Sequence, residues 1–203
     1  MTASFTQGPT DPTVQPVPAS VVEKVDAADT TLHNPKLAVL SLGSNLGNRL
    51  ETLQGAVDAL EDTPGVRIKA VSPVYETEPW GVEPGSQPSY FNAVVVLKTT
   101  LPASSLLERA HAVEEAFHRV RDERWGARTL DVDIVSYADV VSDDPRLTLP
   151  HPRAHERAFV LAPWHDVDPD AQLPGRGAVA DLLDALTREG VTARADLELR
   201  LPE

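Results

Sequence analysis

The sixteen residues RVRDERWGARTLDVDI, at positions 119–134, place two carboxylates one residue apart inside an apolar run. In a β-strand, Asp131 and Asp133 would point to the same face, roughly 6.5 to 7 Å apart along the chain. Carboxylates with no His or Cys beside them suit Mg²⁺, and a pair of such ions can clamp a phosphoryl group between nucleophile and leaving oxygen. A strand with a polar face toward solvent explains the pattern without any metal, and for the D-x-D pair alone that alternative is favoured.

Four arginines precede this pair in the same stretch, Arg119, Arg121, Arg124 and Arg128. A guanidinium group can bind two phosphate oxygens at once through two of its N–H groups. Fixed cations also stabilise the charge that spreads over the non-bridging oxygens in phosphoryl transfer. We therefore expect Arg119 and Arg121 to be catalytic clamps on a polyphosphate. The alternative is that the arginines form salt bridges with the two aspartates, which would leave no site. Trp125 offers a flat face for a nucleotide base or an arginine, or it is a core residue.

Two further clusters carry polar groups that suit a ligand. In the segment 149–160, His151 and Arg157 could both reach a polyphosphate, although a lone histidine there is more often structural. Tyr90 and Asn92 are two residues apart at the start of a predicted strand and share a face. An aromatic ring beside an amide suits a flat heterocycle, because one stacks on it and the other binds its edge. Core packing would explain Tyr90 but not Asn92.

Other common catalytic motifs are missing from the sequence. It contains no G-x-x-x-x-G-K-[ST] loop, no G-x-S-x-G elbow and no H-E-x-x-H pair. GSNLGN, at 43–48, lacks the spacing of a dinucleotide-binding loop. On pattern alone it is a tight strand-to-helix turn in which Ser44 or Asn45 caps the helix.

Composition narrows the possible partners and compartment. The net charge of −13 disfavours binding to nucleic acid or to an anionic membrane. The absence of cysteine excludes disulfides and thiol chemistry and fits a reducing cytoplasm. The sequence has neither an apolar run near the roughly 20 residues of a membrane span nor a secretory signal at its start. We expect a cytoplasmic protein.

The elements that must position these residues follow a simple order. Residues 1–35 are rich in Pro and Thr and predict a flexible tail, and residues 36–203 predict one domain. Apolar periodicity in that domain predicts strands and helices in the order β-α-β-β-α-β over the segments 37–43, 48–62, 66–77, 90–99, 102–120 and 129–137.

This order predicts an α+β fold with a ferredoxin-like core. Two helices would cover one face of an antiparallel sheet, and the other face would be left for long ligand-binding loops and a ligand. A short helix over 156–164, a helix over 178–190 and a last strand over 193–201 would follow, with a hairpin or loop at 138–150.

Three stretches, in this order, resemble motifs of the 6-hydroxymethyl-7,8-dihydropterin pyrophosphokinase family: SLGSNLGNR, RVRDERWGARTLDVDI and PHPRAHERAFVLAP. The resemblance runs from about Leu37 to Pro174. It implies transfer of a pyrophosphoryl group from ATP to the pterin hydroxymethyl group, with release of AMP, in folate biosynthesis. It also implies two Mg²⁺ ions on Asp131 and Asp133, the latter with a catalytic role.

The resemblance further assigns the remaining site residues. For ATP it implies contacts from Glu114, Arg121, Arg124, Trp125, Arg128, Ile134, His151 and Arg157, with Arg119 also on the phosphates. For the pterin it implies a pocket of Gly43, Ser44, Asn45, Thr77, Trp80, Tyr90, Asn92 and Phe159, in which Tyr90 and Phe159 sandwich the ring and Asn92 binds its edge. Trp80 stands where the family commonly has a smaller apolar residue, and Trp164 where it usually has Leu.

Two other functions remain open at this point. One is a non-catalytic ferredoxin-like module that binds a ligand or RNA, against which the acidic composition and the aspartate–arginine stretch argue. The other is a different two-metal nucleotide-dependent transferase, which release of ADP in place of AMP would reveal. We expect a monomer whose partners are small molecules, ATP and a dihydropterin.

Overall fold

The computed structural model describes residues 34–79, 87–117 and 129–201, and residues 33–203 form one compact unit. Six of the predicted site residues lie outside the described residues: Trp80, Arg119, Arg121, Arg124, Trp125 and Arg128. The predicted tail lies outside them as well, except for its last two positions. Among the described residues, no helix is long and apolar enough to cross a bilayer.

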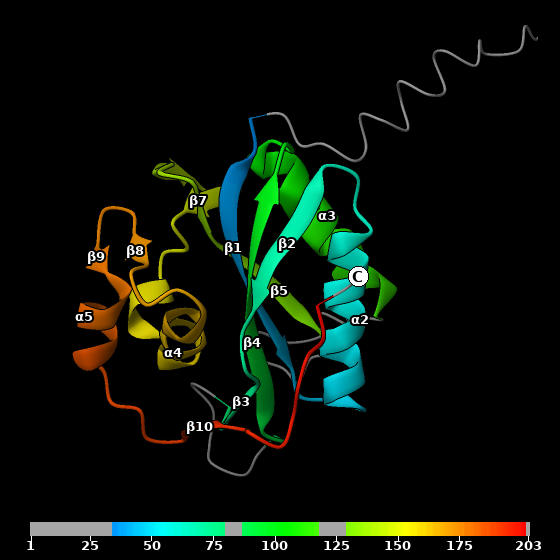
Figure 1. The fold of residues 1–203 in the computed structure, drawn as a ribbon, viewed down its shortest axis with the longest axis vertical. Helices are drawn as coiled ribbons and strands as arrows, with labels where there is room; N and C mark the ends of the chain where they lie inside the picture. Colours follow the sequence, from blue (N-terminus) through cyan, green and yellow to red (C-terminus); the bar gives the residue numbers. More distant parts are fainter. Residues whose placement is uncertain (1–33, 80–86, 118–128, 202–203) are drawn as a thin grey trace, which may run out of the picture. The chain divides into compact units, whose positions relative to one another are not determined.

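The core is an antiparallel sheet (Figure 1). Its strands are β1 (Lys36–Ser44), β2 (Val66–Val71), β3 (Tyr75–Thr77), β4 (Tyr90–Thr99), β5 (Asp131–Tyr137) and β10 (Val191–Ala193). The strand order is β10-β3-β4-β1-β5, and β2 also pairs with β4. The α+β class and the ferredoxin-like order are therefore confirmed.

The strand predicted over 66–77 is interrupted. It forms β2 and β3, separated by residues 72–74, because Pro73 has no N–H to donate to a ladder. Ser72 keeps the break attached to the sheet, since its Oγ accepts from Val94 N at 2.8 Å and its own N–H donates to Val94 O at 2.9 Å.

Two helices cover one face of the sheet, as predicted. They are α2 (Arg49–Glu61) and α3 (Ala103–Ala116). Alternate residues of the strands point toward them and are fully or almost fully buried, among them Leu40 and Leu42 on β1 and Val132 on β5. This larger core follows directly from the period-two pattern of the strands.

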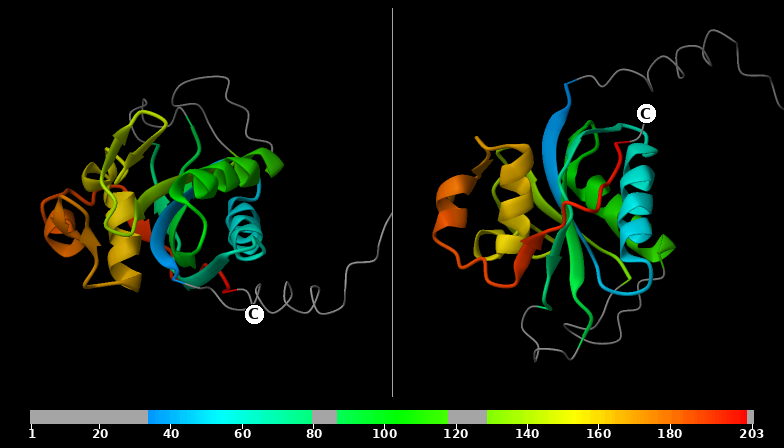
Figure 2. Two further views of the ribbon diagram at one scale, coloured as in Figure 1. Left: turned by 90° about the horizontal axis from the view of Figure 1, so that it is seen from above. Right: turned by 60° about the horizontal axis from the view of Figure 1, so that its bottom comes forward.

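The opposite face is not left entirely to loops and a ligand, and that expectation is wrong for one end of it. The helices α4 (Ala158–Val167) and α5 (Val179–Asp184), with the 3₁₀ turn η1 (Ala154–Glu156), form a second layer there (Figure 2). They bury Val39, Val94, Val96 and Val135, the strand residues that alternate with the first core. The physical reason is that these strands are near-continuous apolar runs, which need cover on both faces.

Two small hairpins and a shortened C-terminus complete the chain. β6 (Ser142–Asp144) pairs with β7 (Leu147–Leu149), which confirms the hairpin alternative at 138–150. β8 (Gln172–Leu173) pairs with β9 (Gly177–Ala178). The predicted helix over 178–190 ends at Asp184, and the last strand is β10, not 193–201.

Candidate functional site

The second face of the sheet changes character along its strands. At one end it is apolar and packs against α4. At the other end the same register brings polar and small residues together. Gly43 of β1 lies between Asn92 of β4 and Asp131 of β5, and Ser41 lies between Val94 and Asp133. This polar end of the sheet, the rows Asn92–Gly43–Asp131 and Val94–Ser41–Asp133, is the candidate site.

The two aspartates share a face, as their spacing predicts. Asp131 and Asp133 are half-buried, whereas Val132 and Ile134 between and after them are buried in the core on the other side. Leu130 just before the strand is also fully buried. The carboxylates are thus fixed by a strand whose intervening side chains are locked in the core.

Positive groups approach Asp133 from the third motif. The Nη1 of Arg157 lies 3.3 Å from Asp133 Oδ2, and the Nε2 of His151 lies 3.8 Å from the same oxygen. The main-chain N–H of His151 donates to Val135 O at 2.8 Å, which ties this segment to β5. Arg157 directly precedes α4 and is 15% exposed in its side chain. The structure therefore brings His151 and Arg157 beside Asp133, and their contact with a polyphosphate stays a prediction.

The protonation of His151 follows from its surroundings. Its Nδ1 accepts from the N–H of Arg153 at 3.1 Å, so the neutral ring carries its proton on Nε2, on the side of Asp133. Burial lowers the pKa of His151; Asp133 opposes this shift and Arg157 adds to it. The ring is therefore a neutral donor at neutral pH.

Arg157 also has an unused donor. Its Nε is buried and has no hydrogen-bond partner among the residues that the structure describes. A buried guanidinium N–H without an acceptor is unfavourable, and an anionic ligand would satisfy it. This orphaned donor fits a phosphate oxygen beside Asp133.

Glu114 is buried between α3 and β5, and its predicted contact with the nucleotide stays a prediction. It is 1% exposed, and its Oε1 accepts from the N–H of Val132 at 2.8 Å. β5 is at the edge of the sheet, so this carboxylate takes the place of a further strand at the residue between the two aspartates. Sequence reasoning missed this role, although Glu114 lies at helical spacing on the buried face of Leu106, Ala110 and Val113.

Several residues predicted to bind the pterin lie close together around the row Asn92–Gly43–Asp131. Asn92 Nδ2 donates to Thr77 Oγ1 at 2.7 Å, and both residues are 4% exposed. A Cβ on Gly43 would lie 3.1 Å from Asn92 Oδ1 and 3.8 Å from Tyr90 Cδ1. Glycine therefore leaves the floor beside the amide open, and any side chain there would press on Asn92.

Of the remaining predicted residues, Asn45 and Phe159 lie near the site, whereas the side chains of Ser44 and Ile134 point to the opposite face of the sheet. Asn45 is at the start of the turn and its Nδ2 donates to Pro88 O at 3.3 Å, two residues before β4. Phe159 is half-buried near Arg157, whose Cζ lies 5.7 Å from its ring centre. The sandwich of a ring between Tyr90 and Phe159 stays a prediction. Ser44 and Ile134 alternate to the α2–α3 face, which leaves their main-chain atoms for the predicted contacts.

The donor set at the site suits magnesium better than zinc. Within the described ranges there is no group of three or more His, Cys, Asp or Glu side chains that could hold a metal ion. Mg²⁺ does not need such a cage, because it is usually bound by one or two carboxylates and completes its shell with water and phosphate oxygens. Asp131 and Asp133 meet that requirement.

Comparisons with known proteins agree with this geometry. The family model described as 7,8-dihydro-6-hydroxymethylpterin-pyrophosphokinase (HPPK) matches residues 39–169. A 2-amino-4-hydroxy-6-hydroxymethyldihydropteridine pyrophosphokinase of Mycobacterium leprae is 48% identical over 170 residues, covering 75% of this chain and 86% of the relative. Its namesake in Pseudomonas aeruginosa is 44% identical over 152 residues, covering 75% and 93%.

Solved structures show the same fold at lower identity. A Plasmodium falciparum HPPK-DHPS triple mutant with STZ-DHP superposes with a TM-score of 0.60 at 16% identity, over 74% of this chain and 43% of that longer one. With a family model that spans most of the described core and relatives that share most of their length with it, the chain belongs to the HPPK family.

Proposed function

We propose that the polar end of the sheet is the active site for the reaction of this family. As a member, the chain is a transferase of folate biosynthesis that moves a pyrophosphoryl group from ATP to the hydroxymethyl group of 6-hydroxymethyl-7,8-dihydropterin. One observation carries the assignment: Asp131 and Asp133 stand on one face of β5, with Arg157 and His151 beside Asp133 and the Asn92–Gly43 row beside Asp131.

The β5 side of the polar end, which carries Asp131 and Asp133, is the proposed phosphate side of the site. Asp131 and Asp133 would hold two Mg²⁺ ions, which when bound neutralise phosphate charge and align the attacking and leaving oxygens. Arg157 offers its orphaned Nε–H to a phosphate oxygen, and His151 offers Nε2–H from the same side. The resemblance adds Arg119 and Arg121 as the catalytic clamps and Arg124, Trp125 and Arg128 as further contacts of the nucleotide.

The β4 side of the polar end, which carries Asn92, is the proposed pterin side. Because Asn92 gives its N–H to Thr77, its Oδ1 remains toward Gly43 as an acceptor for the N–H groups of a pterin edge. Neighbouring strands lie about 4.8 Å apart, so Asn92 and Asp131, on either side of Gly43, are close enough for one ligand to contact both. In the proposed arrangement the hydroxymethyl oxygen would lie near the phosphates, as an in-line transfer requires.

The bond changes define the product. The hydroxymethyl oxygen bonds to the β-phosphorus of ATP, the bond from that phosphorus to the oxygen on the α-phosphorus breaks, and AMP leaves. Incubation with ATP, Mg²⁺ and the dihydropterin, followed by chromatography, is expected to give AMP and pterin diphosphate in equal amounts. ADP as the nucleotide product would point to a different transferase, and binding without turnover to a non-catalytic module.

We also propose that the chain acts as a cytoplasmic monomer on small molecules, without nucleic acid or membrane partners. The net charge of −13 and the lack of cysteine support this. Light scattering coupled to gel filtration, with ATP and Mg²⁺ present, should give the mass of one chain. A mass of two chains would contradict the monomer.

A further inference from the structure

The strand that carries Thr77 is short and depends on its neighbours. β3 has only three residues, and it pairs with β4 on one side and with β10 on the other. Val191 lies opposite Thr77, and Ala193 opposite Tyr75. Two flanking main-chain bonds extend the pairing, from Glu78 N to Gly190 O at 3.4 Å and from Arg194 N to Val74 O at 2.8 Å. The segment 190–194 therefore forms the outer edge of this end of the sheet.

This segment lies beyond the family match, which ends at residue 169. Without it, β3 would present an unpaired edge at the strand that carries Thr77. A three-residue strand paired on one side has few hydrogen bonds to hold it. The position of the Thr77 hydroxyl, and through it the amide of Asn92, thus depends on residues outside the matched segment.

A network of side-chain hydrogen bonds also holds β3, on the face of the sheet opposite to Thr77. Glu76 accepts hydrogen bonds from Arg194, from Arg49 at 3.2 Å and from the Ser89 hydroxyl at 2.6 Å. Arg49 also donates to Ser89 O at 2.8 Å. These contacts join the segment 190–194, the first residue of α2 and Ser89, just before β4, to β3.

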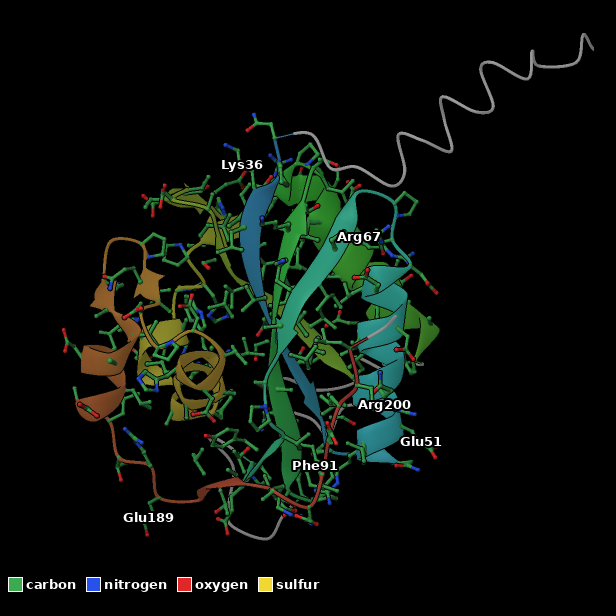
Figure 3. The ribbon with its side chains drawn as sticks, in the orientation of Figure 1. Lys36, Glu51, Arg67, Phe91, Glu189 and Arg200 are labelled. Carbon is green, nitrogen blue, oxygen red and sulfur yellow. The ribbon has the colours of Figure 1, made fainter. Side chains whose placement is uncertain are left out.

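The ring of Phe91 is the apolar support of this network. The guanidinium carbon of Arg49 lies 3.6 Å from its centre and that of Arg194 lies 5.5 Å from it. Phe91 is opposite Glu76 in the β3–β4 ladder and is 7% exposed. Figure 3 shows Phe91 at the end of the sheet where β3 and β10 lie. Two cations over one ring, bridged by one carboxylate, form a unit that stabilises β3 in place.

We infer that Arg194 and Glu76 are positioning residues for dihydropterin binding: with β10 they form a clasp that holds β3, and so the Thr77–Asn92 pair, in place. The clasp comprises residues 190–194 with Glu76, Arg49 and Ser89. It does not touch the ligand. This inference rests on the proposed function, in which Thr77 and Asn92 bind the pterin. According to this inference, the affinity for the dihydropterin depends on the segment 190–194.

The test compares variants of Arg194 by the affinity for each substrate. Arg194→Met keeps an apolar stem over Phe91 and removes the charge, and Arg194→Lys keeps the charge. The Met variant loses a charged hydrogen bond of the clasp, so its KM for the dihydropterin is expected to rise about fivefold. Its KM for ATP should stay within about twofold of that of the unaltered protein. The Lys variant should recover most of the difference.

A second measurement does not depend on turnover. Calorimetric titration of the dihydropterin into protein saturated with a non-hydrolysable ATP analogue and Mg²⁺ should show the same loss of affinity. Arg67→Met is the matched control, because Arg67 forms an Arg–Glu pair with Glu61 at the other end of the same sheet (Figure 3). Its dihydropterin affinity should equal that of the unaltered protein.

Glu76→Gln provides a nearly isosteric variant if Arg194→Met loses its fold by circular dichroism. Unchanged dihydropterin affinity in these variants, or an equal loss for both substrates, overturns the clasp. An equal effect of Arg67→Met does so too. These outcomes are distinct from failure of the proposed function, which would appear as the absence of AMP and pterin diphosphate with the unaltered protein.

Discussion

At the scale of single residues, the site combines two carboxylates with groups that control their charge. Asp131 and Asp133 are held by their own strand, and Arg157 lies beside Asp133, with its Nη1 3.3 Å from Oδ2. Because both carboxylates face the same side, their mutual repulsion favours a bound cation. Removal of either negative charge is therefore expected to impair the chemistry of the site.

Asp133→Asn is expected to lower turnover by about a thousandfold, because a bound metal typically contributes several kcal/mol of transition-state stabilisation. Binding of Mn²⁺, followed by electron paramagnetic resonance in the presence of the ATP analogue, should weaken in parallel. Asp170→Asn, an exposed change in the turn after α4, is the control. Turnover of Asp133→Asn near that of the control would contradict the metal assignment.

Glu114 provides a second prediction at this scale. Glu114→Leu leaves the N–H of Val132 without its acceptor and should lower the free energy of unfolding by about 1–3 kcal/mol. Glu114→Gln keeps an acceptor and should lose less. Urea unfolding measures this, and hydrogen exchange of the Val132 amide tests the contact itself. The exposed neighbour change Glu115→Leu should stay within about 0.5 kcal/mol; equal effects at both positions would rule out the contact.

At the scale of elements, α2 and α3 pack closely where α3 ends. α2 contains Gly55 in its interior, an unfavourable residue for a helix. The reason is the ring of Phe117, which caps α3: a Cβ on Gly55 would lie 2.6 Å from Phe117 Cζ. The glycine thus allows α3 to end against α2, one residue before the segment 118–128.

Gly55→Ala is expected to lower stability by about 1 kcal/mol, because overpacking by about 1–3 kcal/mol outweighs a gain of about 1 kcal/mol in helix propensity. In a Phe117→Leu background the same change should be stabilising, since the ring is gone. Thermal unfolding of the four proteins of this cycle measures the reversal. Stabilisation in both backgrounds would show that the ring does not restrict position 55.

The clasp gives a prediction of pH dependence at the same scale. The pKa of Glu76 is lowered, first by the Ser89 hydroxyl and then by Arg194 and Arg49, while burial opposes the shift. A carboxyl with a lowered folded-state pKa contributes stability above its unfolded pKa of about 4.5 and loses that contribution as the pH falls through the folded value.

The difference in unfolding free energy between the unaltered protein and Glu76→Gln should therefore be constant above about pH 5.5 and shrink below about pH 4.5. Urea unfolding across this range measures it. The control is Glu78→Gln, next to the same strand. A difference that does not change with pH would mean that Glu76 is not ionised in the clasp.

At the scale of the whole molecule, one sheet serves two purposes on one face. Apolar residues at one end pack against the layer of α4 and α5, and the polar end carries the candidate site. The third motif links the two, because Arg157 borders α4 and also contacts Asp133. Packing of the second layer thus supports the site.

Removal of residues 1–32 should leave both stability and turnover unchanged, because residues 33–203 form a unit of their own and the family match begins at residue 39. Unfolding free energy should agree within about 0.5 kcal/mol. Steady-state kinetics with both substrates complete the comparison. A change in the KM of either substrate would assign the tail a part in binding.

The sequence by itself determined what depends on local spacing. The shared face of Asp131 and Asp133, that of Tyr90 and Asn92, and the order of strands and helices follow from periods of two and 3.6, which hold wherever those elements form. The motifs also identified the family, because their residue types and order reflect the chemistry.

Only the tertiary structure decided how distant segments meet. The contact of Arg157 with Asp133, the support of Val132 by Glu114, and the pairing of β10 with β3 join residues 18 or more positions apart. The cover of one end of the second face by α4 and α5 is of the same kind. Such contacts follow from strand register and from burial of apolar surface over the whole domain, which no local pattern encodes.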